Sequence, residues 1–506
     1  MTTSHWAWGP EPDPQELREI ARLFAEHTGL GDPAAWEEPV PAGRLRLPPA
    51  RLPVPGELRE FCTAEPLERA RRTYGQAYRD LIRAYRGDFA HAPDLVALPR
   101  DEGEVERVLD WASAQGIAVV PRGGGTSVVG GVEARFDEPV ICLDLTRMAR
   151  VLEVDTVSRA ALVEAGAAGP ALNAQLPEGL QLRFFPQSYE FSTLGGWIAT
   201  RAGGHYATLH THIDDLVESV RAITPAGVWE SRRLPGSGAG PSPDRWLLGS
   251  EGTLGVITRA WVRLQRRPAH KASAPVRFAE WRAAVDAVHA LAQSGLHPSN
   301  CRLLDAREAA LASGGDGRHA LLIVGFESAD HPVDAAMARA LEITGKHGGL
   351  AGETRQDQAW KGSFTRMPYL RNAYAGLGVI AETFETAVTW DRFPALHEAV
   401  MAEPGVTCRF AFAYPDGPAP YYTVLAEAPR GEEVASWDRL KRRVSETLLR
   451  HGGTITHHHA VGRDHRPFYD RQRPEPFALA LRAAKSALDP RGILNPGVLL
   501  DAGPLD

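Results

Sequence analysis

The chain has 506 residues, which is too long for one ordinary hydrophobic core and predicts two or three globular domains. Its formal charge is −7, from 56 Lys and Arg against 63 Asp and Glu, and the basic residues form no tract, which argues against a nucleic-acid partner. The cysteines form no CxxC pair, and neither a signal peptide nor an apolar run of about 20 residues is found. These features predict a cytoplasmic enzyme with no disulfide framework and no thiolate metal site.

The predicted elements divide the chain into four parts. Residues 1–89 mix a Pro-rich stretch with helix-like runs, which predicts a helical arm packed on the rest of the chain. In residues 90–268, PDLVALP predicts a strand, DEGEVERVLDWASAQG a helix and IAVVPRGGG a strand that runs into glycines, so an α+β domain is expected. Residues 269–440 alternate strands and helices, which predicts a sheet covered by helices on one face. Residues 441–506 are expected to add C-terminal helices and carry a histidine triplet.

The stretch PRGGGTSVVGG (121–131) follows a predicted strand directly. Successive glycines let main-chain N–H groups approach an anion, so this loop is a candidate phosphate cradle; a tight turn without a ligand is the alternative. It is neither a P-loop, because no GK[ST] follows, nor a Rossmann fingerprint, because Val128 takes the third glycine position. PQSYEFSTLGGWIATRAGG and GSEGTLGVITRA repeat the combination of small hydroxyl residues and glycines. Three such loops predict one elongated ligand with several phosphates or hydroxyls.

Together with DPRGILNPG, these motifs resemble the vanillyl-alcohol oxidase type of flavoprotein, which shares the p-cresol methylhydroxylase (PCMH)-type FAD-binding domain. The resemblance implies an α+β fold in which a two-subdomain domain binds FAD, an α/β cap (substrate) domain covers the isoalloxazine and the C-terminal segment closes the flavin site. It implies that residues 121–127 hold the pyrophosphate and that three later segments, 187–193, 200–203 and 251–257, add further FAD contacts. The implied FAD-binding residues are Pro121, Arg122, Gly123, Gly124, Gly125, Thr126, Ser127, Gln187, Ser188, Tyr189, Glu190, Phe191, Ser192, Thr193, Thr200, Arg201, Ala202, Gly203, Glu251, Gly252, Thr253, Leu254, Gly255, Val256 and Ile257. The glycine loop contains no histidine, so we expect non-covalent FAD.

Further motifs resemble one branch, the alkyldihydroxyacetonephosphate synthases of ether-lipid biosynthesis: HWAWG, RMPYLRN, AETFETAVTWDR, TCRFAFAYPDGPAPYY and THHHAVGR. The resemblance implies alkylglycerone-phosphate synthase chemistry without net redox change. A C1 proton leaves acyl-dihydroxyacetone phosphate, flavin N5 forms an adduct at C1, the fatty acid departs and a fatty alcohol takes its place. The alternative is an FAD-linked oxidase or dehydrogenase of a 2-hydroxy acid or alcohol. A non-catalytic flavoprotein scaffold is a third possibility.

Three residues match positions to which the synthase family assigns roles. Arg371 matches a phosphate-binding arginine, and its guanidinium suits phosphate or carboxylate; a surface ion pair is the plain alternative. Thr383 matches a hydroxyl that donates to the same anion, although strands favour threonine in any case. Tyr421 matches a proton-transferring tyrosine, whereas a buried strand aromatic is the alternative; only one of Tyr421 and Tyr422 can face the pocket.

The histidine triplet His457, His458 and His459 has three interpretations: a metal site, a catalytic cluster or a solvated loop. An extended backbone would place His457 and His459 on one face and His458 on the other, and the only nearby carboxylate in sequence is Asp464, so we expect no metal. The resemblance implies a catalytic role beside Tyr421, with the facing histidine left open. His205, His210 and His212 are expected to be structural. The expected partner is a small-molecule or lipid substrate, and peripheral membrane contact and a homodimer stay open.

Overall fold

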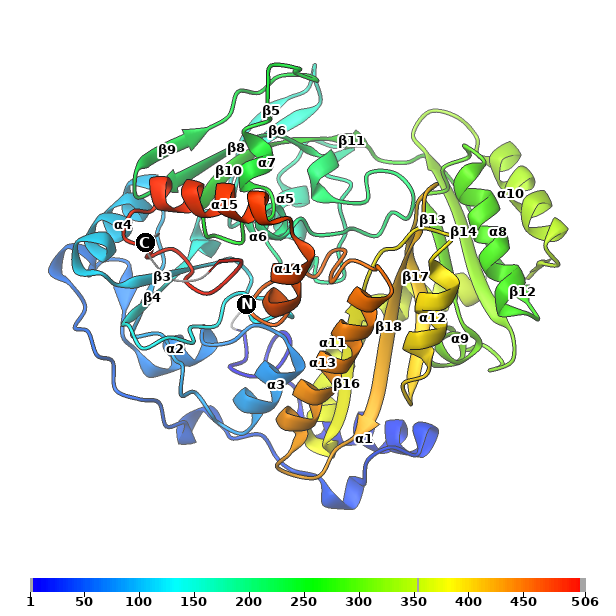
Figure 1. Cartoon of the computed structure of the whole chain (residues 1–506), viewed down its shortest axis with the longest axis horizontal. Coiled ribbons are helices and arrows are strands. Elements are labelled where there is room, and N and C mark those ends of the chain that lie inside the picture. Colours follow the sequence, from blue (N-terminus) through cyan, green and yellow to red (C-terminus); the bar gives the residue numbers. More distant parts are fainter. Residues whose placement is uncertain (1–2, 353–354, 501–506) are drawn as a thin grey trace.

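The computed structural model describes residues 3–352 and 355–500, with the side chains of residues 355–365 left out. Two sheet-containing halves lie side by side, and the C-terminal helices run between and across them (Figure 1). In the part of the chain described, no helix is long and apolar enough to cross a membrane. All four cysteines, Cys62, Cys142, Cys301 and Cys408, are buried and free.

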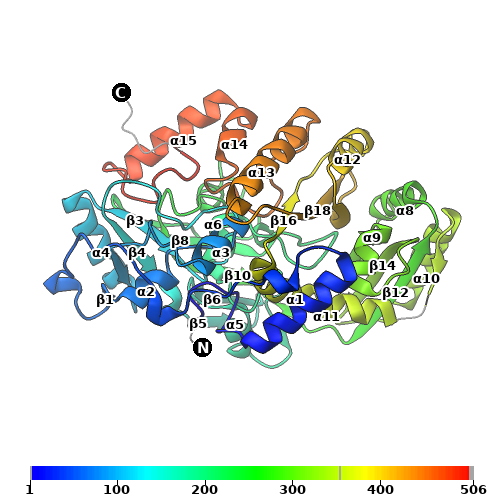
Figure 2. The same cartoon turned by 90° about the horizontal axis from the view of Figure 1, so that it is seen from below.

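The N-terminal arm packs mainly on the half of the molecule that residues 270–450 form. Helix α1 (Pro14–Thr28) begins at Asp13, whose carboxylate accepts the N–H of Gln15 at 2.7 Å, and ends at Gly29 with a φ of 70°. It lies along α11 (Arg355–Leu377), where the rings of Phe24 and Tyr374 stand 4.1 Å apart (Figure 2). The remaining arm elements are η1 (Pro33–Ala35), η2 (Ala42–Arg44), η3 (Gly56–Leu58), β1 (Cys62–Thr63), α2 (Pro66–Arg71) and α3 (Tyr78–Tyr85).

The first sheet has the strand order β1-β2-β4-β3, in which β2 (Leu95–Ala97), β4 (Val140–Asp144) and β3 (Ala118–Arg122) are parallel. Helix α4 (Glu102–Gln115) connects β2 to β3, with an Asp101 cap at its start and Gly116 in the left-handed region at its end. The strand, helix and strand predicted from residue 93 onward are therefore confirmed. This connection places the end of β3, and the glycine loop after it, at the edge where parallel strands terminate together.

The second sheet is antiparallel, in the order β5-β6-β10-β8-β9, and shares one hydrophobic core with the first. Its strands are β5 (Val151–Asp155), β6 (Ala160–Glu164), β8 (Val217–Thr224), β9 (Gly227–Glu230) and β10 (Val256–Arg263). The connecting elements are η4 (Leu145–Arg147), α5 (Gly169–Ala174), α6 (Leu194–Thr200), η5 (Ile213–Asp215), α7 (Asp244–Leu247) and the paired short strands β7 (Leu180–Gln181) and β11 (Gln265–Arg266).

The third large sheet, called the cap sheet below, is antiparallel in the order β15-β12-β14-β13-β17-β18-β16. Its strands are β12 (His270–Phe278), β13 (Asn300–Leu304), β14 (Ala320–Ser328), β15 (Leu350–Ala351), β16 (Val379–Glu385), β17 (Val406–Ala413) and β18 (Pro418–Glu427). Helices α8 (Trp281–Gln293), α10 (Asp334–Lys346), α12 (Phe393–Met401) and α13 (Glu433–Arg450) cover one face.

The prediction that helices cover only one face of this sheet is wrong. Leu321 and Ile323 alternate with Leu322 and Val324 along β14, and both sets are buried. Helix α9 (Ala306–Ser313) packs on the first pair, together with Met367 of α11, while α8 and α10 pack on the second. The continuous apolar run ALLIVGF reflects burial on both faces.

The C-terminal segment crosses back from the cap to the first sheet. Helix α13 packs against α3 and β16, whereas α14 (Arg466–Gln472) and α15 (Glu475–Leu488) lead back to the other half (Figure 1). Beyond α15, the Val119 N–H donates to the Ile493 carbonyl and the Asn495 N–H donates to the Val119 carbonyl, both at 2.8 Å. Residues 493–495 are thereby hydrogen-bonded to β3, just before the glycine loop.

Candidate active site

A cavity of about 730 Å³ lies where the first two sheets, the cap sheet, α1 and the histidine segment meet. Most of the residues assigned to FAD or substrate from the sequence line it. These are Pro121, Arg122, Gly123, Gly124, Gly125, Thr126, Ser127, Gln187, Ser188, Ser192, Thr193, Thr200, Ala202, Gly203, Glu251, Gly252, Gly255, Ile257, Arg371, Thr383, Tyr421, His458 and His459. Segments far apart in sequence are thus brought to one site.

The other assigned residues are not among those that line the cavity. They are Tyr189, Glu190, Phe191, Arg201, Thr253, Leu254, Val256 and His457. Tyr189 donates its hydroxyl to the Gly169 carbonyl at 2.8 Å, Glu190 accepts from Tyr369 at 2.7 Å and Arg201 pairs with Asp214 at 2.8 Å. These three side chains are therefore engaged by other parts of the protein.

The glycine loop (residues 121–131) presents main-chain donors to the cavity. Within the described residues, the N–H groups of Gly124, Gly125, Thr126 and Ser127 donate to no protein acceptor, and Gly125 has a φ of 66°. Side chains are excluded here, since a Cβ on Gly124 would lie 1.9 Å from the Phe191 carbonyl oxygen. A run of free N–H groups behind a strand is an anion-binding concavity, and it fits the pyrophosphate of FAD.

The other two FAD-type loops are fixed by hydrogen bonds to neighbouring segments. Thr193 caps α6 by accepting the Gly196 N–H at 3.4 Å, and Ser192 accepts the Trp197 indole N–H at 2.6 Å. Glu251 is buried in the left-handed region, with a φ of 50°, and accepts the N–H groups of Val461 at 2.9 Å and Gly462 at 2.8 Å. Burial raises the pKa of Glu251 to about 7. This carboxyl therefore joins the third loop to the segment just after the histidines.

One face of the cap sheet carries the polar side chains of the site. In the strand register, Thr383 of β16 lies opposite Thr423 of β18, and Tyr421 of β18 lies between Glu385 of β16 and Arg409 of β17. Because side chains alternate along a strand, these residues share the face that lines the cavity, whereas Tyr422 points into the apolar core beside Phe384.

Tyr421 is almost fully buried, and its surroundings act on its pKa in opposite directions. Burial raises the pKa, while the Arg409 guanidinium, 3.9 Å from the ring centroid, and the hydrogen-bonded Thr383 hydroxyl lower it. The His458 ring lies 5.9 Å away in a stacked arrangement and the His459 ring 5.3 Å away edge-on. The tyrosine is thus held between a cation and two imidazoles at the cavity wall.

Arg371 reaches the cavity from α11. Its Nη2 donates to the Gln76 carbonyl at 3.0 Å, and its buried Nε has no hydrogen-bond acceptor in the described part of the protein. Burial lowers its pKa. A guanidinium with unmet donors at a cavity wall favours an anionic ligand there.

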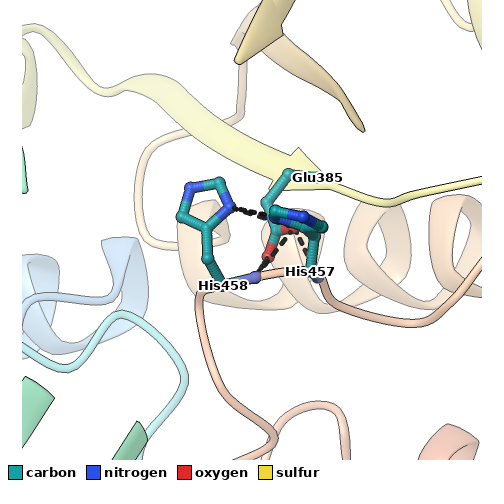
Figure 3. Close-up of side chains that lie close together, drawn as sticks. All are labelled: Glu385, His457 and His458. Carbon is teal, nitrogen blue, oxygen red and sulfur yellow. Dashed lines mark hydrogen bonds and ion pairs between the residues drawn. The ribbon is translucent and has the colours of Figure 1, made fainter. Parts of the chain in front are cut away.

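The histidine segment is a bend that folds around a carboxylate, so the premise of an extended backbone is wrong. Glu385 accepts the N–H groups of His457 at 2.5 Å and His458 at 3.3 Å (Figure 3). It also accepts the His459 N–H at 2.9 Å and the Thr456 hydroxyl at 2.6 Å. His458 and His459 line the cavity and His457 turns away from it, which corrects the grouping of His457 with His459.

The same carboxylate bears on the metal interpretation. Ligand atoms of Glu385, His457 and His458 lie within 4.8 Å of one another, so Glu385 is a carboxylate partner that the local sequence did not reveal. Asp464, the candidate carboxylate, instead pairs with Arg79. Both oxygens of Glu385 already accept hydrogen bonds from the bend, and together with the histidines these bonds hold its pKa far below the usual range although burial opposes them. Glu385 therefore stabilises the bend that carries the histidines.

Several cavity residues were missed from the sequence. Arg302 of β13 and Arg409 line the same face, and Arg409 donates to Glu308 of α9 at 2.5 Å. Their position could have revealed them: each arginine interrupts an otherwise apolar strand, NCRLL or VTCRFAFA, and a buried charge requires a partner or a ligand. Ile20, Leu23 and Phe24 of α1 add an apolar edge that periodicity alone could not assign to the site.

The comparisons with known proteins agree with this architecture. Residues 93–231 match the FAD binding domain family, and residues 267–499 match the family of FAD linked oxidases, C-terminal domain. A solved structure titled alkyldihydroxyacetonephosphate synthase superposes with a TM-score of 0.81 at 24% identity, covering 98% of this chain and 97% of that one. These matches confirm the predicted PCMH-type fold and FAD as the cofactor.

Two curated relatives identify the branch. The alkyldihydroxyacetonephosphate synthase of Trypanosoma brucei brucei is 31% identical, over 91% of this chain and 82% of the relative. The enzyme of the same name from Dictyostelium discoideum is 29% identical, over 97% of this chain and 85% of the relative. The chain belongs to the alkyldihydroxyacetonephosphate synthase family.

Proposed function

We propose that this protein is an FAD-dependent alkylglycerone-phosphate synthase, which exchanges the acyl group of acyl-dihydroxyacetone phosphate for a fatty alcohol. One observation carries the proposal: a single cavity joins a cationic wall to an apolar edge. Arg371, Arg302 and Arg409 line the first, and Ile20, Leu23 and Phe24 of α1 line the second. A substrate with an anionic head and a long apolar tail matches both parts.

The anionic head group is assigned to Arg371 and Thr383. Arg371 has unmet donors, and Thr383 lies on the adjacent face of β16 within the same cavity. Charge-assisted hydrogen bonds to phosphate are about twice as strong as neutral ones, so Arg371 would contribute most to holding the head.

Proton transfer is assigned to Tyr421 with His458 and His459. When bound, FAD supplies an isoalloxazine that can accept and return an electron pair, so the exchange needs no external oxidant. The substrate must lose a C1 proton and regain it, and the proton of the incoming alcohol must leave. Tyr421 lies beside two imidazoles whose pKa values burial lowers to about 3 for His458 and about 4 for His459, so neutral bases are available near neutrality.

A second candidate is an FAD-linked oxidase or dehydrogenase, which the match of residues 267–499 to FAD linked oxidases favours. Arg371 would then hold a carboxylate and His458 would accept the hydroxyl proton. The apolar edge formed by α1 has no task in that reaction with a small hydroxy acid.

One experiment separates the two. Anaerobic FAD-bound protein is mixed with acyl-dihydroxyacetone phosphate and a fatty alcohol, and in parallel with 2-hydroxy acids, while products and flavin absorbance are followed. We expect alkyl-for-acyl exchange without consumption of an electron acceptor. Complete flavin bleaching by a hydroxy acid, with no exchange, would show that the synthase assignment is wrong.

Five further points stay predictions. We propose non-covalent FAD, because the glycine loop has no histidine; acid precipitation should release all flavin into the supernatant. The four-part division at residues 89, 268 and 440 can be checked by limited proteolysis. Cytoplasmic localisation can be checked by fractionation. Membrane contact and a homodimer are tested by vesicle flotation and by sedimentation.

A further inference from the structure

His457 belongs to a hydrogen-bonded chain that runs away from the cavity. His457 Nδ1 lies 3.1 Å from His458 Nδ1, and His457 Nε2 lies 2.9 Å from the Tyr414 hydroxyl. That hydroxyl lies 3.0 Å from Thr211 Oγ1, which lies 3.1 Å from His212 Nδ1. His212 Nε2 closes a ring by lying 3.1 Å from the main-chain carbonyl of His457. Three side chains, those of His457, Tyr414 and Thr211, therefore connect the cavity-lining imidazole of His458 with His212, a histidine expected to be merely structural.

The carbonyl at the end of this chain determines the direction of every hydrogen bond in it. A carbonyl only accepts, so His212 Nε2 must carry a proton, and a neutral His212 must then accept at Nδ1. Thr211 consequently donates to His212 and accepts from the Tyr414 hydroxyl, which in turn accepts from His457 Nε2–H. His457 Nδ1 is left as an acceptor, so the proton between the two imidazoles belongs to His458 Nδ1.

This order leaves His458 Nε2 as a lone pair. Nε2 has no protein partner within the described residues, while Nδ1 faces both His457 and, at 3.5 Å, the Glu385 carboxylate. The carboxylate also favours a proton on Nδ1, so two independent contacts agree. The other charged or titratable groups that act on His458 are His459, His212 and Arg409, and Tyr421 stacks against it.

We propose that Tyr414, Thr211 and His212 are positioning residues that hold His458 as a base toward the cavity and relay its proton outward through His457. When His458 Nε2 takes a proton, Nδ1–H passes to His457 Nδ1, His457 Nε2–H to Tyr414, the Tyr414 hydroxyl proton to Thr211 and the Thr211 proton to His212 Nδ1. Each hydrogen bond reverses and none is lost. The charge ends on His212, which is half-buried and, unlike His458, is not among the residues that line the cavity.

The relay rests on the proposed function only in requiring that a proton be taken up at His458. Its first test needs no substrate. In FAD-bound protein labelled with ¹⁵N-histidine, nitrogen chemical shifts distinguish the two neutral tautomers, and signals are assigned by their loss in His458→Gln, His457→Gln and His212→Gln. We expect Nδ1–H for His458 and Nε2–H for His457 and His212. Nε2–H on resting His458 would overturn the proposal, whatever the substrate is.

The second test breaks the chain at one atom. Tyr414→Phe removes the only acceptor assigned to His457 Nε2–H, so we expect the His458 tautomer to become mixed and kcat for exchange to fall about 10-fold or more with KM and FAD content unchanged. Tyr206→Phe is the matched control, because its buried phenol donates to Glu327, at 3.4 Å, outside the cavity. An unchanged tautomer and kcat in Tyr414→Phe would contradict the relay and leave the synthase assignment intact.

Discussion

The wall formed by the glycine loop and the wall formed by the cap sheet border the same cavity but present different atoms to it. The first offers main-chain N–H groups, and its glycines are required because a Cβ would collide with the Phe191 backbone at Gly124 and with the side chains of Thr193 and Arg122 at Gly123 and Gly125. The second offers Tyr421, Thr383, Arg409 and the histidines, all side chains held on a rigid strand face or a braced bend. Substitutions in the first wall should therefore change cofactor retention, and substitutions in the second should change turnover while FAD stays bound.

The largest effect is expected from Gly124→Ala. The new Cβ would lie 1.9 Å from the Phe191 carbonyl oxygen, so the loop must move out of the position that holds the pyrophosphate. We expect loss of bound FAD, measured by flavin absorbance per protein, and loss of activity with it. Gly43→Ala, at a position with open space around the Cβ, is the control and should keep its flavin.

Tyr421→Phe tests the second wall. Removing one hydroxyl from the cavity should leave FAD content unchanged and reduce kcat by roughly 100-fold or more, in the range of general acid–base catalysis. Tyr422→Phe is a matched control on the other face of the same strand, where we expect near-normal turnover. Equal turnover of the two variants would remove Tyr421 from the mechanism.

Arg371→Met separates substrate binding from catalysis within the second wall, because it should raise KM more than it lowers kcat. Loss of charge-assisted hydrogen bonds worth about 1.5–3 kcal/mol predicts a KM for the phosphorylated substrate roughly 10- to 100-fold higher. Flavin content should not change. Arg282→Met, on the exposed face of α8, is the control. A normal KM for Arg371→Met would place the head group elsewhere.

The smallest effect concerns the bend between the two walls. Ala460 follows the histidines with a φ of 74°, a conformation that costs a residue with a Cβ about 1–2 kcal/mol. Ala460→Gly should raise the midpoint of thermal unfolding by roughly 1–2 °C. Ala283→Gly within helix α8 should lower it, since glycine is unfavourable inside a helix. A lower midpoint for Ala460→Gly would show that the bend is not strained.

The sequence predicted the first wall better than the second. Glycine clusters beside hydroxyl residues report a local backbone requirement, so the three loops and the α+β fold could be inferred directly. Arg302 and Arg409 come together only through the register of the cap sheet, and Glu385 contacts the histidines from 72 to 74 residues away in the sequence. The expectation of an extended histidine segment failed for this reason, since the distant carboxylate sets the bend. His212 could not be connected to His457, 245 residues later, without the fold.

The hydrogen bonds between residues 493–495 and β3 also have a consequence for synthesis of the protein. Val119 is joined on both its N–H and its carbonyl to the C-terminal segment, and the Asn495 side chain donates to the carbonyls of Glu251 and Gly131. During translation, the glycine loop leaves the ribosome long before residues 493–495 have been synthesised. The FAD site can therefore reach its final form only after residue 495 has been translated. Until then, the first two sheets must remain soluble without their C-terminal contacts.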